Sequence, residues 1–304
     1  MSPKLLKHLP YLMVATAAIL WGTIGIYIDL LNTWGFTSIE IVAFRVITAT
    51  ILLFFYLLIR DKSLLSVQIS HLYLFFGTGV LSISFFNWSY FTAIGETSLS
   101  VAVVLLYTGP AFVVIMARIF FKELITPQKL AALLLTLLGV ILVVELFSDT
   151  GKISLYGAFV GISAGLGFAL YTIFSKAALR RYQPLTIIFY TFLMSSLFIT
   201  PLSGLVTPPT LERLQDLNTL LVIISLGIFP TVLAYLLYTE ALGRIEAGKA
   251  SITTMTEPIA ATLIGVIIYG EILNFLQIIG ILLVLLSVLM IQIRNNKIIN
   301  GETS

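Results

Sequence analysis

Residues Tyr238–Glu271, YTEALGRIEAGKASITTMTEPIAATLIGVIIYGE, repeat residues Tyr90–Glu123, YFTAIGETSLSVAVVLLYTGPAFVVIMARIFFKE, at an ungapped offset of 148. Identical residues with this offset include Tyr90 and Tyr238, Ala93 and Ala241, Gly95 and Gly243, Ala102 and Ala250, Thr108 and Thr256, Pro110 and Pro258, Ile119 and Ile267, and Glu123 and Glu271. Apolar matches carry little weight in an apolar chain. A glycine, a mid-segment proline and a terminal glutamate at one spacing indicate two related halves.

The composition places the chain in a bilayer. Of 304 residues, 59% are hydrophobic and 10% are charged, and the mean hydropathy is +1.07. A soluble domain carries about 25% charged residues. Without cysteine there is no disulfide framework or thiolate chemistry, and two histidines, His8 and His71, do not indicate a metal site. We therefore expect no metal and no cofactor. The net charge is +3, but the basic residues lie in short loops between apolar segments, so the charge does not indicate a nucleic-acid partner.

Continuous apolar runs predict membrane-spanning helices, because the strands of a barrel would alternate in polarity. A helix needs about 20 apolar residues to cross a bilayer. That length gives ten predicted spans: 10–31, 39–60, 71–94, 98–121, 127–147, 153–176, 184–206, 217–242, 249–269 and 274–294. The first span follows Lys4 and Lys7 as a signal peptide would, but its apolar run is too long and no cleavable region follows.

The loops fix an orientation. With the N-terminus inside, 13 of the 17 Lys and Arg residues lie on the inner side and two on the outer side, with Arg45 and Arg118 within spans. Both termini are therefore expected in the cytoplasm of a bacterial-type plasma membrane. The Gly95 loop lacks basic residues, whereas its mate at Gly243 carries Arg244, and five spans separate them. The predicted fold is an all-α integral membrane protein with ten transmembrane helices in two inverted five-helix repeats, residues 10–147 and 153–294.

Short motifs in both halves carry a family resemblance. They are Trp21-Gly22, Phe44-Arg45, Pro110 and Phe121-Lys122-Glu123 in the first half, and Glu257-Pro258 and Tyr269-Gly270-Glu271 in the second. The order, spacing and duplication of these motifs resemble the EamA-like branch of the drug/metabolite transporter superfamily over nearly the whole length of the chain. The resemblance implies a central cavity lined mainly by spans one, three, four, six, eight and nine, and a small metabolite or drug-like substrate.

Glu257 is the candidate for proton or ion coupling. It lies about 12 Å into the ninth span at 1.5 Å per residue. A carboxylate there costs about 2.5–3.5 kcal/mol, so it should face protein or a cavity. It could hold a proton or a substrate amine, and the alternative is a structural carboxylate bonded to a neighbouring helix. Glu240 and Glu145 are lesser candidates for coupling.

Two prolines and one arginine also lie within spans. Pro110 and Pro258 are repeat mates near mid-span, where each frees a carbonyl, so they are candidate hinges or static kinks. Arg45 is expected to face inward. It could bind a substrate carboxylate, but the family resemblance implies an ion pair with Glu40, Glu145 or Asp29 on the outer side, which is favoured over contact with substrate.

Aromatic and polar residues on the spans expected to line the cavity are candidate substrate contacts, because Tyr and Trp offer an apolar face and one polar tip. The predicted cavity residues are Trp21, Asn87, Trp88, Tyr107, Tyr171, Tyr235, Tyr238, Thr253 and Glu257. For any single aromatic, ordinary packing is the alternative. Glu123 and Glu271 are expected to cap helices or order loops.

Gly157, Gly161 and Gly165 recur at every fourth position, which predicts close helix packing between the two halves. A homodimer through this face is the alternative to the expected monomer. The predicted function is a secondary transporter that exports a small amphipathic metabolite, such as an amino acid, by alternating access, and not an enzyme. A lipid-modifying intramembrane enzyme and an uncoupled channel or flippase are the alternatives. No GxxxxGK[ST] loop for ATP occurs.

Overall fold

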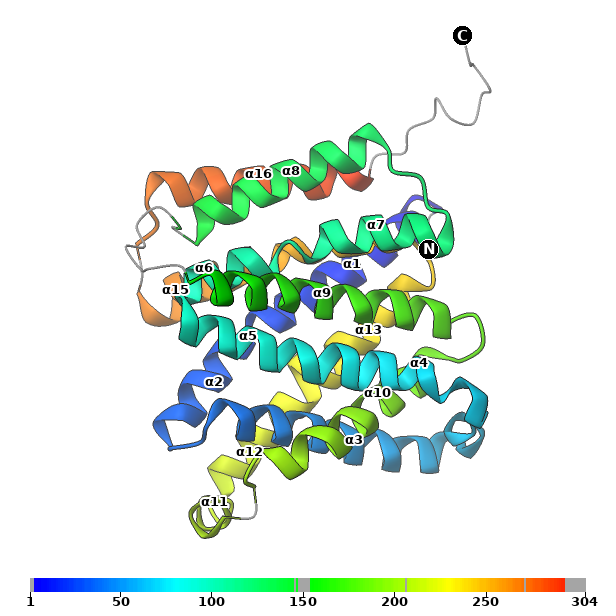
Figure 1. Ribbon diagram of the computed structural model, residues 1–304, viewed down its shortest axis with the longest axis vertical. Helices are drawn as coiled ribbons and strands as arrows, with labels where there is room; N and C mark the ends of the chain where they lie inside the picture. Colours follow the sequence, from blue (N-terminus) through cyan, green and yellow to red (C-terminus); the bar gives the residue numbers. More distant parts are fainter. Residues whose placement is uncertain (1–2, 145, 147–153, 206, 271, 293–304) are drawn as a thin grey trace.

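The computed structural model describes residues 3–144, 146, 154–205, 207–270 and 272–292, and these residues form helices and loops without a strand (Figure 1). The first half contains α1 (Pro3–Gly22), α2 (Ile24–Thr33), α3 (Ser38–Arg60), η1 (Lys62–Leu65), η2 (Ile69–His71), α4 (Leu72–Thr78), η3 (Gly79–Ser84), α5 (Phe85–Glu96), α6 (Leu99–Leu106), α7 (Gly109–Phe121) and α8 (Pro127–Val143). The second half contains α9 (Leu155–Ala178), α10 (Pro184–Ile199), η5 (Thr200–Leu202), α11 (Pro208–Arg213), α12 (Leu217–Gly227), η6 (Ile228–Leu233), α13 (Ala234–Leu242), α14 (Ala247–Thr253), η7 (Thr254–Thr256), α15 (Glu257–Tyr269) and α16 (Phe275–Gln292).

These elements combine into the predicted spans. Within the described residues, nine helical segments are long and apolar enough to cross a membrane, and α8 is a tenth, shorter apolar helix. The observed starts agree with the predicted ones to within two residues. The α10–η5 segment ends at Leu202, four residues before its predicted end. The chain is an all-helical membrane protein whose two five-span halves are inverted, because an odd number of crossings separates them.

The two halves exchange their first helices. α1 packs on α13 and α15 of the second half, and α9 packs on α5, α6 and α7 of the first. α3 packs on α10 and α12, while α8 and α16 pair at one edge of the bundle (Figure 1). The hydroxyls of Thr136 and Ser287 are 2.7 Å apart in that outer pair. The main core therefore lies between the halves and not inside either one.

Glycines on α9 permit this close approach. A Cβ on Gly157 would lie 2.6 Å from Thr97 Cγ2, and a Cβ on Gly161 would lie 2.6 Å from Leu105 Cδ1. A Cβ on Gly165 would lie 2.7 Å from the Thr108 hydroxyl oxygen. Real Cβ atoms do not approach their neighbours so closely, and these three neighbours, Thr97, Leu105 and Thr108, belong to the first half. The predicted close packing between the halves is confirmed.

Helix irregularities recur at repeat-related positions. The third span contains the π-helical turn η3 and the eighth contains η6, which lies 149 residues later. The fourth span is interrupted at Tyr107 and Thr108, and the ninth is interrupted by the 3-10 turn η7. Only the eighth span has a proline in its π turn, Pro230, so proline alone does not cause these turns. Inside a membrane, such breaks are tolerated where the backbone faces protein or a cavity.

Candidate functional site

The irregular turns surround a cavity between the two halves. We call it the central cavity and define it by its lining residues, Trp21, Ile24, Arg45, Ser82, Ile83, Phe86, Leu106, Tyr107, Phe168, Tyr171, Tyr235, Met255 and Glu257. They come from spans one, three, four, six, eight and nine, with α2 completing the first span and Arg45 added from the second. A volume of about 70 Å³ is open to the centres of water-sized molecules. A water needs roughly 10–15 Å³ on this scale, so the cavity has room for several water molecules.

Glu257 gives the cavity a carboxylate near the middle of a membrane span. The 3-10 turn η7 ends at Thr256, and Glu257 then opens α15, within the span Ala247–Tyr269. Its side chain is partly exposed and lines the central cavity. It forms no hydrogen bond or ion pair within 4.0 Å to any described residue. The carboxylate is thus available to a proton or to a cationic group of a solute.

Arg45 places a cation on the same cavity. Its Nε donates a 2.8 Å hydrogen bond to the Thr231 hydroxyl, and its guanidinium carbon lies 5.8 Å from the centre of the Tyr235 ring. The Thr231 hydroxyl in turn donates to the Leu226 carbonyl oxygen at 2.8 Å, across the π turn η6. A first-half cation is therefore held by a second-half helix.

The prediction that Arg45 forms an ion pair with Asp29 or Glu40 is wrong, because no described carboxylate lies within 4.0 Å of the Arg45 nitrogens. Glu40 instead accepts a hydrogen bond from Thr210 and closes the start of α3 through a capping box. Glu145, the third expected partner, lies outside the described residues. The pairing implied by the family resemblance is therefore not formed with Asp29 or Glu40, and Arg45 donates to Thr231 instead.

Four predicted aromatics line the cavity together. Tyr235 lies edge-on to Trp21 and to Tyr171, with ring centroids 5.1 Å and 5.0 Å apart. Tyr107 joins them from the break between α6 and α7. The Tyr171 hydroxyl is 2.7 Å from that of Thr239. The indole Nε1 of Trp21 is buried and has no hydrogen-bond partner among the described residues.

Asn87 and Trp88 lie outside the cavity lining. The Asn87 amide donates a 2.7 Å hydrogen bond to the carbonyl oxygen of Ile83, which is itself a lining residue. Asn87 therefore satisfies the backbone beside the cavity. Trp88 faces away, since 56% of its surface is exposed on the outside of the bundle. One residue along a helix turns a side chain by about 100°, which explains their different surroundings.

Tyr238 and Thr253 also stand behind the lining. Tyr238 is fully buried, its ring is 5.4 Å from that of Trp21, and its hydroxyl is 2.7 Å from that of Thr172. The buried Thr253 hydroxyl donates to the carbonyl oxygen of Lys249, one turn earlier, at 2.9 Å. Neither residue lines the cavity, and Tyr238 packs directly behind the lining residue Trp21.

Pro110 and Pro258 occupy equivalent places after the two breaks. Each is the second residue of its helix, α7 or α15, where a missing N–H costs no intrahelical hydrogen bond. The carbonyl oxygen of Leu106 lies against Gly165 of α9, at 3.0 Å from the position of a Cβ there. That carbonyl oxygen therefore faces the interface with α9.

The repeat itself held the signal for several lining residues that the sequence reasoning missed. Pairs of lining residues related by 147, 148 or 149 positions are Trp21 and Phe168, Ile24 and Tyr171, Tyr107 and Met255, and Phe86 and Tyr235. The repeat mates of the four predicted aromatics, at the offset that relates the two halves, are Phe168, Ile24, Met255 and Phe86, and all four line the cavity. Ser82 had no such signal.

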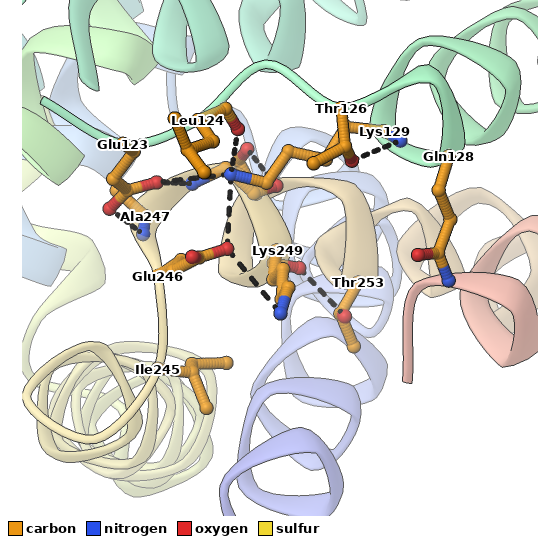
Figure 2. Close-up of polar contacts among 12 residues, drawn as sticks. Glu123, Leu124, Thr126, Gln128, Lys129, Ile245, Glu246, Ala247, Lys249 and Thr253 are labelled. Atoms are coloured by element: carbon orange, nitrogen blue, oxygen red, sulfur yellow. Dashed lines mark hydrogen bonds and ion pairs between the residues drawn. The ribbon is translucent and has the colours of Figure 1, made fainter. Parts of the chain in front are cut away.

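A second group of charges joins the halves at the end of the bundle that carries the α7–α8 and α13–α14 connections (Figure 2). We call it the charge cluster, and its members are Glu123, Lys129, Lys176, Glu246 and Lys249. The Glu123 carboxylate accepts hydrogen bonds from the backbone N–H groups of Ala247 at 2.7 Å and Gly248 at 3.2 Å. It thereby caps α14 in the other half, as expected for a capping residue. Glu271 lies outside the described residues.

Lysines complete the charge cluster. Lys129 Nζ is 3.0 Å from Glu246 and 3.6 Å from Glu123, and its side chain is 3% exposed. Lys176 Nζ donates to the carbonyl oxygens of Leu242 at 3.2 Å and Ile245 at 2.6 Å, where α13 ends. Burial raises the pKa of Glu246, but Lys129 and Lys249 outweigh it and leave that pKa below its ordinary value.

No group of three His, Cys, Asp or Glu side chains that could hold a metal occurs in the described part of the chain. The chemistry of the central cavity is therefore that of one carboxylate, one guanidinium and aromatic faces with hydroxyl and indole tips. These groups can bind an amphipathic solute and can exchange a proton.

Known proteins share both sequence and fold with this chain. An uncharacterized transporter of Archaeoglobus fulgidus is 31% identical over 216 residues, which cover 70% of this chain and 75% of that protein. The uncharacterized transporter YwfM of Bacillus subtilis is 30% identical over 217 residues, 68% of this chain and 69% of its own. A crystal structure with 17% identity superimposes with a TM-score of 0.77 over 92% of this chain and 95% of its own, which shows the fold alone.

The profile of the EamA-like transporter family matches the chain twice, at residues 8–145 and 155–293. The two matches fall on the two halves that the internal repeat defines. Because they cover most of the chain, the protein belongs to the EamA-like transporter family.

Proposed function

We propose that this transporter exports a small amphipathic metabolite, such as an amino acid, across a bacterial-type plasma membrane by alternating access. One observation carries the proposal. The central cavity lies between two inverted halves and combines an unpaired carboxylate, Glu257, with a cation and aromatic faces. Secondary transporters place their substrate sites at such an interface, near the middle of the membrane, beside broken helices.

The two halves, 10–147 and 153–294, are the units that we propose to move against each other. Pro110 and Pro258 would act as hinges, since they begin the half-helices that follow the two breaks. The basic loops favour cytoplasmic termini, because 13 of 17 Lys and Arg residues lie on one side. The charge cluster then lies at the cytoplasmic end. The protein functions as a monomer in this proposal.

Glu257 is the proposed coupling residue. Glu257 lies within a membrane span, where an unpaired charge is costly and a bound proton would neutralise it. Protonation from one side and release to the other would link proton movement to the exchange between the two states. Glu240, the lesser candidate, is bonded to Arg244 on the surface and does not line the cavity.

Proteoliposomes containing the purified protein test this proposal. We expect uptake of at least one of the twenty common L-amino acids to respond to an imposed pH gradient. Glu257→Gln should abolish that response and lower the rate at least ten-fold, and Glu240→Gln is the matched control. Transport by Glu257→Gln with an unchanged gradient response would overturn the coupling role. Transport that never responds to a gradient would instead indicate an uncoupled channel or flippase.

The orientation can be tested separately, because the chain contains no cysteine. Single cysteines introduced at Ser2 and Ser304 should resist an impermeant maleimide in intact cells and react after lysis. A cysteine at Thr97, in the loop between α5 and α6, should react in intact cells. If either terminus is labelled in intact cells, the chain has the opposite orientation in the membrane to the one proposed.

A further inference from the structure

Arg45 is a buried cation with no carboxylate partner among the described residues. Its side chain lies within the second span, is 9% exposed and lines the central cavity. An arginine within a membrane span is costly and normally pairs with a carboxylate or with backbone carbonyls. Here Glu40 is engaged at the start of α3, and the Glu257 carboxylate lies beyond ion-pair distance. The positive charge at this site is therefore left for another anion.

The orientation of Arg45 is fixed from the opposite half. The π turn η6 leaves the Leu226 carbonyl oxygen available, and the Thr231 hydroxyl donates to it at 2.8 Å. The same hydroxyl oxygen accepts the 2.8 Å hydrogen bond from Arg45 Nε, and the Tyr235 ring lies beside the guanidinium. Thr231 uses only the Nε–H, and Tyr235 interacts with the guanidinium through a side-chain hydrogen bond. Further terminal N–H groups remain, and an arginine fork can bind a carboxylate through them in bidentate fashion.

A second donor on the same cavity, the indole N–H of Trp21, has no hydrogen-bond partner among the described residues. Trp21 lines the cavity, and its Nε1 is buried. Buried donors are nearly always satisfied in folded proteins, so this N–H can donate to water or to an acceptor of a ligand in the cavity. The guanidinium of Arg45, the indole N–H of Trp21 and the carboxylate of Glu257 line one cavity, and together they match a solute that carries both an anionic and a cationic group.

We propose that Arg45 binds the carboxylate of the transported substrate and that Thr231 is the residue that positions the guanidinium for it. The assignment rests on the proposed function, since it names the group that recognises the anionic end of the substrate. The guanidinium belongs to the first half and its positioning hydroxyl to the second. Substrate recognition therefore depends on the relative placement of the two halves. A purely structural Arg45 would stabilise the interface between the halves without favouring a carboxylate in the ligand.

The test compares ligands that differ only at the carboxylate. Purified wild-type protein is screened by thermal shift and by equilibrium binding against the twenty common L-amino acids and the α-amide of each amino acid that binds. We expect wild-type protein to bind the acid at least ten-fold more tightly than its amide. Arg45→Gln should remove this preference, and Arg45→Lys should keep part of it. Size-exclusion profiles and unliganded melting temperatures report whether each variant is folded.

Thr231 supplies the matched pair of variants. Thr231→Val removes the hydroxyl at nearly constant volume, and we expect about ten-fold weaker binding of the acid with the affinity for the amide unchanged. Thr231→Ser keeps the hydroxyl and should restore binding of the acid. If Arg45→Gln and Thr231→Val lower stability but preserve the ratio of acid to amide affinity, the inference is overturned and the proposed function stands. If wild-type protein neither binds nor transports any amino acid or amide, both are overturned.

Discussion

The two broken spans have the same backbone design but different chemistry. α6–α7 and α14–α15 are interrupted at equivalent positions and resume with a proline as the second helical residue. The residue before that proline is Gly109 in the first half and Glu257 in the second, 148 positions later. A Cβ on Gly109 would lie 2.8 Å from the Phe168 ring and 3.0 Å from the Gly165 carbonyl oxygen. Glu257 instead lines the cavity without a partner.

The two halves therefore share a backbone design, but only the second half places a carboxylate on the central cavity at this position. In the first half the break serves helix packing, and in the second it presents a carboxylate to the cavity. The starts of the two broken spans differ as well. The Ser98 hydroxyl accepts a hydrogen bond from the N–H of Val101 within its own half, whereas α14 is capped by Glu123 from the other half. Variants at equivalent positions should therefore have unequal effects.

The largest effect on stability is expected where one half caps the other. Glu123→Ala would leave two N–H groups of α14 without an acceptor and would remove one of the two carboxylates that neutralise the buried Lys129. Removing one partner from a buried charge pair costs about 3–5 kcal/mol. Unfolding titrations in detergent should show a loss of that size. Glu240→Ala is the control, because Glu240 and Arg244 form an exposed pair of the kind worth less than about 1 kcal/mol. Equal losses in the two variants would contradict the difference between them.

Alanine at the two equivalent positions before the prolines should give opposite results. Gly109→Ala overpacks the contact with Phe168 and should lower the free energy of unfolding by about 1–3 kcal/mol. Glu257→Ala removes a carboxylate with no protein partner, so stability should hold while transport is lost. Unfolding titrations and proteoliposome uptake on both variants provide the measurement. A stable Gly109→Ala variant alongside a destabilised Glu257→Ala variant would reverse the comparison.

The sequence predicted the fold well because bilayer length and loop charge act on whole segments. It found the two halves and the spans, and it identified Trp21, Tyr107, Tyr171 and Tyr235, which line the cavity together. It did not predict how side chains turn within a span. Trp88 faces outward, and neighbouring positions in a uniformly apolar helix have no pattern that distinguishes them. The partner of Arg45 was missed for a related reason, because Thr231 is 186 residues away on a π turn.

The ends of the broken spans should differ by a smaller amount. Lys122 and Gly270 end α7 and α15 in the same left-handed conformation, with φ of 57° and 71°. That conformation costs a non-glycine residue roughly 1–2 kcal/mol. Lys122→Gly should therefore stabilise the protein by about 1 kcal/mol, and Gly270→Ala, where no atom lies within 4 Å of the new Cβ, should destabilise it similarly. Melting temperatures of both variants would measure this. Shifts of the same sign would show that something other than backbone conformation dominates.

The smallest effect concerns the pH dependence of the charge cluster. Burial alone would raise the pKa of Glu246, but Lys129 and Lys249 lower it below the ordinary value for glutamate. Its contribution to stability is therefore complete above about pH 4.3, the pKa of an unfolded glutamate, and is lost as the pH falls through the lower folded pKa. Since the Glu246 side chain is 42% exposed, we expect about 0.5 kcal/mol.

Melting temperatures of wild-type protein and Glu246→Gln between pH 3 and 7 would measure this contribution. The gap between the two proteins should be constant down to about pH 5 and should close below about pH 4. Glu212→Gln, on the exposed surface of α11, is the control for the loss of a surface carboxylate. A gap that widened in acid would mean that burial, and not the two lysines, determines the direction in which the pKa of Glu246 is shifted. The charge cluster would then bind the two halves together mainly through Glu123.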